Sequence, residues 1–340
     1  MSLSRLDPMV RAPESEVWAD AVSALGAVRS VALACHVGPD GDALGSLLGL
    51  TLGLRALGKE TVSSWGSTPF RVPRQYAFLP GLDLLSPPER FPAVPDLLVT
   101  FDTGSLDRLG TLARSAGAAR CVIVVDHHAS NTRYGDINLV DPDAAASVVL
   151  VDELLRQLGV ALDPQIATCL YTGLTTDTGS FKFQATTPAV HTFAARLLAT
   201  GIRHDAIARA VWDTNRFGYL RLLGEALGRA HLEPAHDLVW TWTTQQDFAA
   251  HDVVMEEIEG VIDVLRTTVE AEVAIVCKEA DDGTFMVSMR SKGRVDVGAV
   301  CVALGGGGHR FAAGFTSSSP LDATVASLRT ALDEAPRLTP

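Results

Sequence analysis

The stretch Cys121-Val122-Ile123-Val124-Val125-Asp126-His127-His128 decides the fold, because an apolar run ends there in one carboxylate and two imidazoles. A β-branched run of this length is typical of a central strand in a parallel sheet, buried on both faces. Open α/β sheets bind ligands beyond the carboxyl ends of such strands. The stretch therefore predicts an α/β domain that presents polar side chains at one edge of its sheet.

Three further apolar runs in the first half of the chain also lead into acids or imidazoles. We expect residues 31–35, 97–101 and 170–174 to form strands like the first one. Because the carboxyl ends of parallel strands meet at one edge of a sheet, the residues that follow should converge there. The residues that we expect at this edge are His36, Asp40, Asp42, Asp102, Asp126, His127, His128 and Asp177.

This set of side chains indicates a metal centre. Five of the residues are aspartates, and so many carboxylates in one place repel one another unless cations hold them together. Carboxylates and imidazoles without an evident thiolate suit Mn²⁺ best, with Mg²⁺, Co²⁺ or Fe²⁺ as substitutes. Two such ions can activate a bridging hydroxide for in-line attack at phosphorus. The expected chemistry is metal-assisted hydrolysis of a phosphoester.

The rest of the chain indicates a second, smaller α/β domain. We expect Ser147 to cap a helix that ends near Leu158, and residues 188–229 to form a helical linker. Beyond the linker, strands over 238–242, 273–277 and 285–289 should alternate with helices over 256–269 and 321–332. Two polar motifs lie in this part, Arg290-Ser291-Lys292 and Gly305-Gly306-Gly307-Gly308-His309. Glycine N–H groups in such a run can surround an anion, and the cationic side chains would complement them.

Composition and charge narrow the class of protein. With 340 residues and 47% hydrophobic content, the chain should fold into two domains with sizeable cores. The formal charge of −12 argues against a grip on long duplex DNA, which requires many basic residues. The five cysteines have no CxxC spacing and are expected as buried free thiols. Without an apolar span or a signal pattern, we expect a cytoplasmic protein with no membrane partner.

The order of these motifs resembles the DHH phosphoesterase superfamily. The resemblance rests on His36-x-x-x-Asp40-x-Asp42, Asp102, Asp126-His127-His128 and Asp177, and the glycine run with His309 extends it to the DHH plus DHHA1 architecture. It implies a larger parallel-sheet DHH catalytic domain over 1–187, the helical linker over 188–229 and a smaller α/β DHHA1 domain over 230–340. In its length, the chain resembles one branch of this family, the bacterial nano-RNases that are also phosphatases of 3′-phosphoadenosine-5′-phosphate (pAp).

The resemblance also implies roles for individual residues. Asp102 would bridge two Mn²⁺ ions, one held with His36 and Asp40 and the other with Asp42, His127 and Asp177. Of the two catalytic residues, His128 would meet the scissile phosphate and Asp126 would orient a histidine. Binding of the rest of the substrate would fall to Asn131, Arg290, Ser291, Lys292, Gly307, Gly308 and His309. The chain departs from the commonest sequence of the family at Arg310-Phe311-Ala312-Ala313-Gly314, which leaves the preference for base and chain length open.

Several functions share these motifs. The first expectation is an exonuclease that degrades short RNA oligonucleotides to 5′-mononucleotides and also dephosphorylates pAp. An alternative is a cyclic-dinucleotide phosphodiesterase acting on c-di-AMP or its linear product pApA. A third hypothesis, which is not enzymatic, is a nucleotide-binding regulator whose metal site is inactive. RecJ-like exonucleases need additional DNA-gripping modules, and pyrophosphatases of the DHH type carry a different second domain. We also expect a homodimer, from apolar helices that look exposed.

Overall fold

The computed structural model describes residues 15–338. It divides into two compact units between Thr214 and Asn215. That division lies inside the range 188–229 that we expect as a linker. Helices α6 (Pro188–Leu198) and α7 (His204–Trp212) pack against α5 (Pro164–Asp177) in unit 1, whereas α8 (Phe217–Gly228) packs in unit 2. The helices of the expected linker are thus shared between the two units.

Unit 1 is built on a parallel sheet of five strands in the order β2-β1-β3-β4-β5. The bounds of the strands are Ser30–Cys35 for β1, Glu60–Trp65 for β2, Leu98–Phe101 for β3, Val122–Asp126 for β4 and Ile137–Val140 for β5. Strand β4 is the opening apolar run, and all five of its residues are buried. The prediction of a central parallel strand is confirmed.

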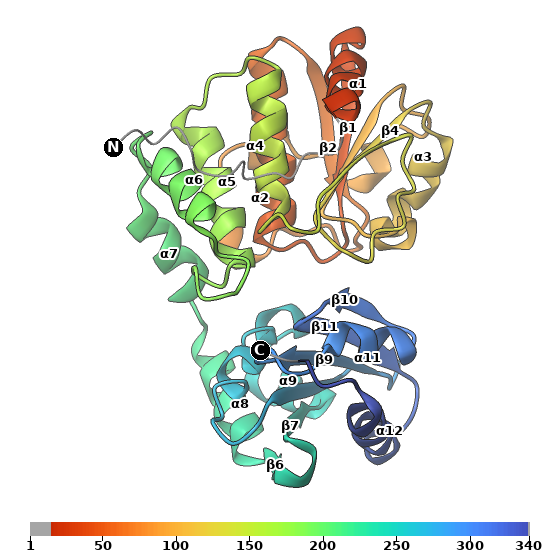
Figure 1. Ribbon diagram of the computed structural model, residues 1–340, viewed down its shortest axis with the longest axis vertical. Helices are drawn as coiled ribbons and strands as arrows, with labels where there is room; N and C mark the ends of the chain where they lie inside the picture. Colours follow the sequence, from red (N-terminus) through yellow and green to blue (C-terminus); the bar gives the residue numbers. More distant parts are fainter. Residues whose placement is uncertain (1–14, 339–340) are drawn as a thin grey trace. The chain divides into compact units, whose positions relative to one another are not determined.

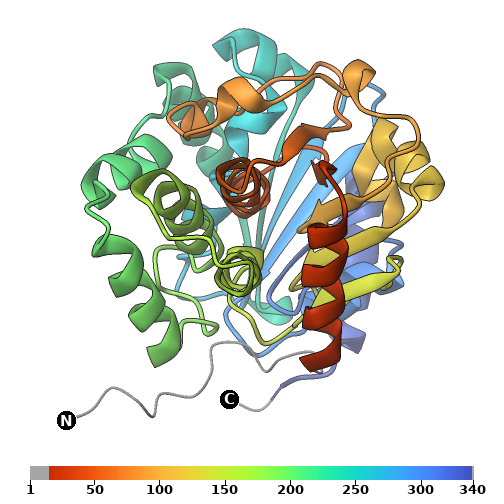
Figure 2. The same cartoon turned by 90° about the horizontal axis from the view of Figure 1, so that it is seen from above.

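Helices cover both faces of this sheet. One face packs on α1 (Ser15–Ala27), α2 (Gly41–Ala56) and α4 (Ser147–Gln157), and α5 packs on α2 and α4 to complete the main core. The other face packs on a 3₁₀ segment (Leu106–Leu112) and α3 (Ala113–Ala118). Figure 1 shows α3 and α4 on opposite sides of β4, and Figure 2 shows α2 and α4 nearly end-on beside each other. Burial of both faces accounts for the continuous apolar runs of β3 and β4.

The prediction of a strand over residues 170–174 is wrong. These residues belong to α5, a helix of 14 residues that begins at Pro164 after the capping side chain of Asp163. A short apolar run bounded by polar residues fits a buried strand or a buried helix equally well, because both are apolar on every side. Asp163-Pro164 is the helix-start signal that separates the two. Asp177 is therefore the last residue of a helix, not the tip of a strand.

Unit 2 contains a six-stranded sheet in the order β10-β11-β9-β8-β7-β6, in which only β7 and β8 are parallel. The bounds of its strands are His231–Glu233 for β6, Leu238–Thr243 for β7, Val273–Glu279 for β8, Phe285–Ser291 for β9, Gly307–His309 for β10 and Ala312–Ser317 for β11. The helices that pack on this sheet are α8, α9 (Gln245–His251), α10 (Val261–Leu265), α11 (Val297–Ala303) and α12 (Leu321–Glu334).

One helix of unit 2 is shorter than expected. In place of a continuous helix over 256–269 there is a 3₁₀ turn, Met255–Ile258, followed by α10. Gly260 separates them, and a Cβ there would lie 2.8 Å from the hydroxyl oxygen of Tyr219. The glycine thus allows close packing on Tyr219 of α8, where any side chain would clash. Elsewhere the expected α/β organisation of unit 2 is confirmed.

Two further expectations concern thiols and membranes. All five cysteines lie in the described part of the chain and are free, four of them buried and Cys121 partly exposed. Within residues 15–338, no helix has the length and apolar character that crossing a membrane requires.

Candidate metal centre

The predicted ligands of unit 1 come together at the carboxyl edge of its sheet. His36 directly follows β1, Asp102 follows β3, and His127 and His128 follow β4. Asp40 and Asp42 lie at the start of α2, and Asp177 ends α5. Gly45 allows α2 and α5 to approach, since a Cβ there would lie 2.5 Å from the carbonyl oxygen of Cys169. Close packing of these two helices brings acids from both to the edge of the sheet.

A first group of ligand atoms forms around His36. Its Nε2 lies 3.8 Å from Asp40 Oδ2 and 3.4 Å from Asp102 Oδ2. The Nδ1 atom faces the carbonyl oxygen of Val37 at 2.9 Å, which turns Nε2 toward the acids. Asp40 uses its other oxygen, Oδ1, to cap α2 by accepting the N–H groups of Asp42 and Ala43. One carboxylate oxygen of Asp40 therefore serves the fold and the other faces the site.

A second group forms around His127. Its Nε2 lies 2.9 Å from Asp177 Oδ2, 3.5 Å from Asp102 Oδ1 and 3.8 Å from Asp42 Oδ2. The opposite nitrogen, Nδ1, lies 3.1 Å from the carbonyl oxygen of Ala144, which orients the ring. A backbone carbonyl behind the imidazole is the usual arrangement for a histidine that binds a metal through its other nitrogen.

Asp102 connects the two groups. Its Oδ2 faces His36 and its Oδ1 faces His127, so one buried carboxylate is shared. The backbone of Asp102 has φ of 52°, in the left-handed region that few residues other than glycine, asparagine and aspartate adopt. Such strain persists where the surrounding structure enforces it, commonly at functional sites.

The electrostatics of the cluster are those of acids held close together. Burial and the charges of Asp102 and Asp177 raise the pKa of Asp42 well above its usual value. Burial opposes ionisation of Asp102 too, but hydrogen bonds with His127 and His36 hold its pKa well below the usual range. Burial lowers and the acids Asp102 and Asp40 raise the pKa of His36, with a net value of about 10.

The donor atoms fit divalent cations. Ligand atoms of His36, Asp40 and Asp102 lie within 4.8 Å of one another, and so do those of Asp42, Asp102 and His127. Hard oxygen donors with imidazole nitrogens match Mn²⁺ and related ions. Asp102 is common to these two groups.

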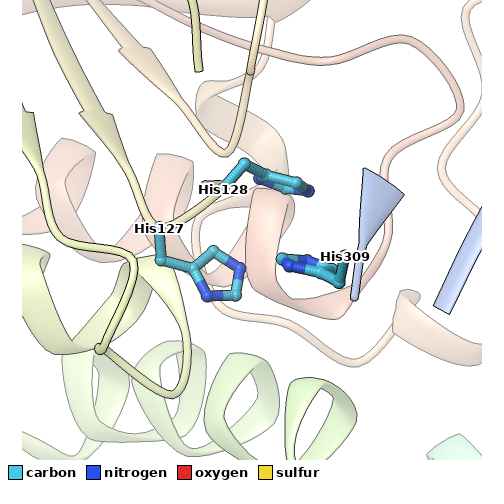
Figure 3. Close-up of side chains that lie close together, drawn as sticks. All are labelled: His127, His128 and His309. Carbon is cyan, nitrogen blue, oxygen red and sulfur yellow. The ribbon is translucent and has the colours of Figure 1, made fainter. Parts of the chain in front are cut away.

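Asp126 organises the histidine pair. Its Oδ1 accepts the N–H of His127 at 2.9 Å and lies 2.8 Å from His128 Nδ1, and its Oδ2 accepts the amide N–H of Asn131. Figure 3 shows His127 and His128 leaving neighbouring positions just after β4, and their rings meet edge to face at 5.0 Å. With Nδ1 turned to Asp126, Nε2 of His128 lies on the opposite side of its ring. Asn131 thus supports Asp126, a contact that no sequence pattern indicates.

Ser147 is not the helix cap that we expect. It is the first residue of α4, and Ala146 occupies the capping position without a side-chain hydrogen bond. The main-chain N–H groups of Ser147 and Val148 donate instead to Asp42 Oδ2 at 2.6 Å and Oδ1 at 3.0 Å. The cap comes from a residue 105 positions away, which local sequence rules cannot find.

The predicted substrate-binding residues of unit 2 lie near one end of its sheet. Arg290 is on β9, and its Nη1 donates to the carbonyl oxygen of Met289 at 3.0 Å. The Ser291 hydroxyl donates to Glu272 Oε1 at 2.9 Å, and Lys292 Nζ donates to the carbonyl oxygen of Thr268. Burial lowers the pKa of Arg290, while the acids Asp263 and Glu259 oppose that shift.

The glycine run is part of the sheet. Gly307, Gly308 and His309 form strand β10, which pairs with β11, and Figure 3 labels His309 on it. Gly308 has φ of 135°, and a Cβ there would lie 2.6 Å from the Cα of Ala313. Residues 307–309 therefore form an edge strand whose backbone approaches its neighbour closely, and the contact of the glycine N–H groups with an anion stays a prediction.

Comparisons with known proteins agree with this architecture. Residues 30–174 match the model of the DHH family, N-terminal domain, and residues 245–336 match the model of the DHHA1 domain. The chain is 36% identical over 313 residues to the bifunctional oligoribonuclease and PAP phosphatase NrnA of Thermus thermophilus, covering 90% of each chain. It is 27% identical over 306 residues to the Bacillus subtilis protein of the same name, covering 88% of this chain and 93% of that one.

A solved structure agrees with the whole fold. An exopolyphosphatase-related protein from Bacteroides fragilis superimposes with a TM-score of 0.85 at 22% identity, covering 95% of this chain and 97% of that one. Together, the two matched domains and the arrangement of the acidic edge define a phosphoester hydrolase. The chain belongs to the DHH/DHHA1 phosphoesterase family, as its motifs predict.

Proposed function

We propose that this chain is a Mn²⁺-dependent enzyme that hydrolyses short RNA oligonucleotides to 5′-mononucleotides and removes the 3′-phosphate of pAp. The observation that carries the proposal is the position of Asp102, whose two oxygens face His36 and His127. A shared carboxylate between two imidazoles is suited to holding a pair of neighbouring divalent ions. The oligoribonuclease and PAP phosphatase from Thermus, at 36% identity, supports the choice of substrates.

The two groups of side chains support the ligand sets that we propose. His36, Asp40 and Asp102 would hold one ion, and Asp42, Asp102, His127 and Asp177 the other. When bound, two such ions supply Lewis acidity and a nucleophile at neutral pH. The protein's part is to fix these side chains before substrate arrives. The buried carboxylates and the contacts behind each imidazole do this.

His128 is the proposed partner of the scissile phosphate. Asp126 holds its Nδ1, which leaves the orientation of the ring fixed and directs Nε2 away from Asp126. In that position Nε2 would donate a hydrogen bond to a phosphate oxygen and deliver a proton to the leaving oxygen. Asn131 would keep Asp126 in place through its amide group.

For the rest of the substrate we propose residues of unit 2. Arg290 would bind a second phosphate through its planar guanidinium, and His309 with Gly307 and Gly308 would contact the adjoining sugar or phosphate. Ser291 and Lys292 already donate to Glu272 and to the carbonyl of Thr268, so we propose that they hold this segment in shape. The homodimer stays a prediction.

Turnover of one substrate panel tests the proposal. The full chain with Mn²⁺ would be assayed on pAp, pApA, c-di-AMP and 5′-labelled RNA from two to about twenty-four nucleotides. We expect turnover to fall as the RNA lengthens, with pAp also hydrolysed. Preference for c-di-AMP would favour the cyclic-dinucleotide alternative. Tight binding of pAp without turnover, in the presence of bound Mn²⁺, would favour the regulatory alternative.

A further inference from the structure

The first turn of α4 lies against the two carboxylates of the second ligand group. Its N–H groups donate to both oxygens of Asp42, and the Ser147 hydroxyl donates to Asp102 Oδ1 at 3.2 Å. Ser147, Asp42 and Asp102 are all buried, with side chains shielded from water. Three hydrogen bonds from one helical turn therefore hold two acids, one on α2 and the other just after β3.

This arrangement has a physical reason. The first N–H groups of a helix lack partners within the helix and carry its partial positive charge. A carboxylate placed there satisfies them and is stabilised in its charged form. Each oxygen of Asp42 accepts one N–H and has a further lone pair, so the contact orients the carboxylate while leaving it able to bind a cation.

The hydroxyl of Ser147 acts on the shared carboxylate. Asp102 presents Oδ1 to the His127 side and Oδ2 to the His36 side, so the orientation of its carboxylate plane decides whether it is shared. A donor on Oδ1 resists rotation away from that orientation. Its neighbour Ala146 has no polar side chain that could do the same.

We propose that Ser147 is a positioning residue that fixes the shared Asp102 and thereby sets the affinity of the metal centre. The inference rests on the proposed function, because it concerns the same pair of ions. Hydrogen-bond partners behind metal ligands commonly change metal affinity by about 10–100-fold when they are removed. Ser147 needs no contact with substrate for this role.

Calorimetric titration of the metal-free full chain with Mn²⁺ tests the proposal. We expect Ser147→Ala to weaken Mn²⁺ binding by about 10–100-fold. Ser147→Cys should weaken it as well, because a thiol fills the volume but donates poorly. The matched control is Ser63→Ala, which removes another buried hydroxyl. Ser63 lies on β2, and its hydroxyl pairs with that of Thr51 on α2.

The outcomes separate this inference from the proposed function. If the wild-type chain binds Mn²⁺ and both Ser147 variants bind it within twofold of wild type, the positioning role is wrong and the proposed function stands. Weaker binding in Ser147→Ala but not in Ser147→Cys would assign the effect to packing and also overturn the role. If the wild-type chain binds no Mn²⁺, both proposals fail together. Thermal unfolding in EDTA checks that each variant is folded.

Discussion

The acidic edge of unit 1 and the Arg290 to His309 segment of unit 2 differ in what their polar side chains contact. In unit 1, His36 and His127 each face Asp102, at 3.4 and 3.5 Å. In unit 2, Ser291 and Lys292 contact a buried glutamate and a backbone carbonyl of their own unit. The first region is arranged for a charge that comes from outside the chain, whereas much of the second holds its own fold.

The comparison predicts the largest effect at Asp102. We expect Asp102→Asn to lower kcat/KM on pAp by roughly 10³-fold, since a shared metal ligand contributes several kcal/mol to the transition state. Asparagine also tolerates the left-handed backbone at this position, so the fold should persist. Initial rates at saturating Mn²⁺ and circular dichroism would measure the two effects.

A matched control for Asp102 exists at the opposite end of the same strand region. Asp96 precedes β3, is largely exposed and pairs with Arg120 at the surface. Asp96→Asn should leave kcat/KM within about twofold, because exposed ion pairs contribute little. Equal activity of Asp102→Asn and wild type would contradict the shared ligand and remove the contrast between the two regions.

The second prediction asks which part of unit 2 serves the substrate. Arg290→Ala should lower kcat/KM by roughly 10–100-fold, the loss expected for a charge-assisted hydrogen bond to a phosphate. Mn²⁺ binding should not change, because the ligand set lies in the other unit. Steady-state rates on pAp and a Mn²⁺ titration would test both statements.

Arg337 provides the control for this change. It is a half-exposed arginine of unit 2 that pairs with Asp237 at 3.1 Å. Arg337→Ala should leave the kinetics as they are. If Arg290→Ala has wild-type kinetics but lowers the unfolding temperature, Arg290 belongs with Ser291 and Lys292 among the residues that hold the fold.

Much of unit 1 could be predicted because its signals are local. A β-branched run that ends in Asp126, His127 and His128 identifies both the strand and the polar edge. The prediction of a strand before Asp177 is wrong, since apolar residues on all sides give no periodicity to separate helix from strand. The helix-start signal lies at Pro164, well before the ligand.

Contacts between distant residues were beyond any local rule. Asp42 caps a helix that begins at Ser147, 105 positions further along the chain, and no spacing rule connects the two. The same holds for Glu272, which accepts the hydroxyl of Ser291 from another strand. Sequence patterns identify residues that can bind a cation or an anion. Only tertiary contacts show whether such a residue faces a binding site or pairs with another residue of the fold.

The smallest effect on activity is expected at Glu272. This buried carboxylate accepts the Ser291 hydroxyl, and the N–H and Nε–H of Arg294 at 2.7 and 3.0 Å. Glu272→Gln should lower the free energy of unfolding at pH 7 by about 1–3 kcal/mol, because it weakens hydrogen bonds to a charged group. It should change kcat/KM by less than about threefold, since the segment it supports keeps its backbone hydrogen bonds with β11.

The lowered pKa of Glu272 determines how its contribution to stability changes with pH. Burial opposes ionisation of Glu272, but the hydrogen bonds from Arg294 and Ser291 hold its pKa below the usual value of 4.5. The native carboxylate therefore stabilises the fold fully above pH 4.5, and that contribution is lost as the pH falls through the lower native pKa. Urea unfolding between pH 7 and pH 3 should show the gap between wild type and Glu272→Gln narrowing on the acid side. Glu270→Gln, at an exposed position nearby, should show no gap. A raised KM for Glu272→Gln at unchanged stability would mean that this segment is arranged for substrate, as the edge of unit 1 is for metal.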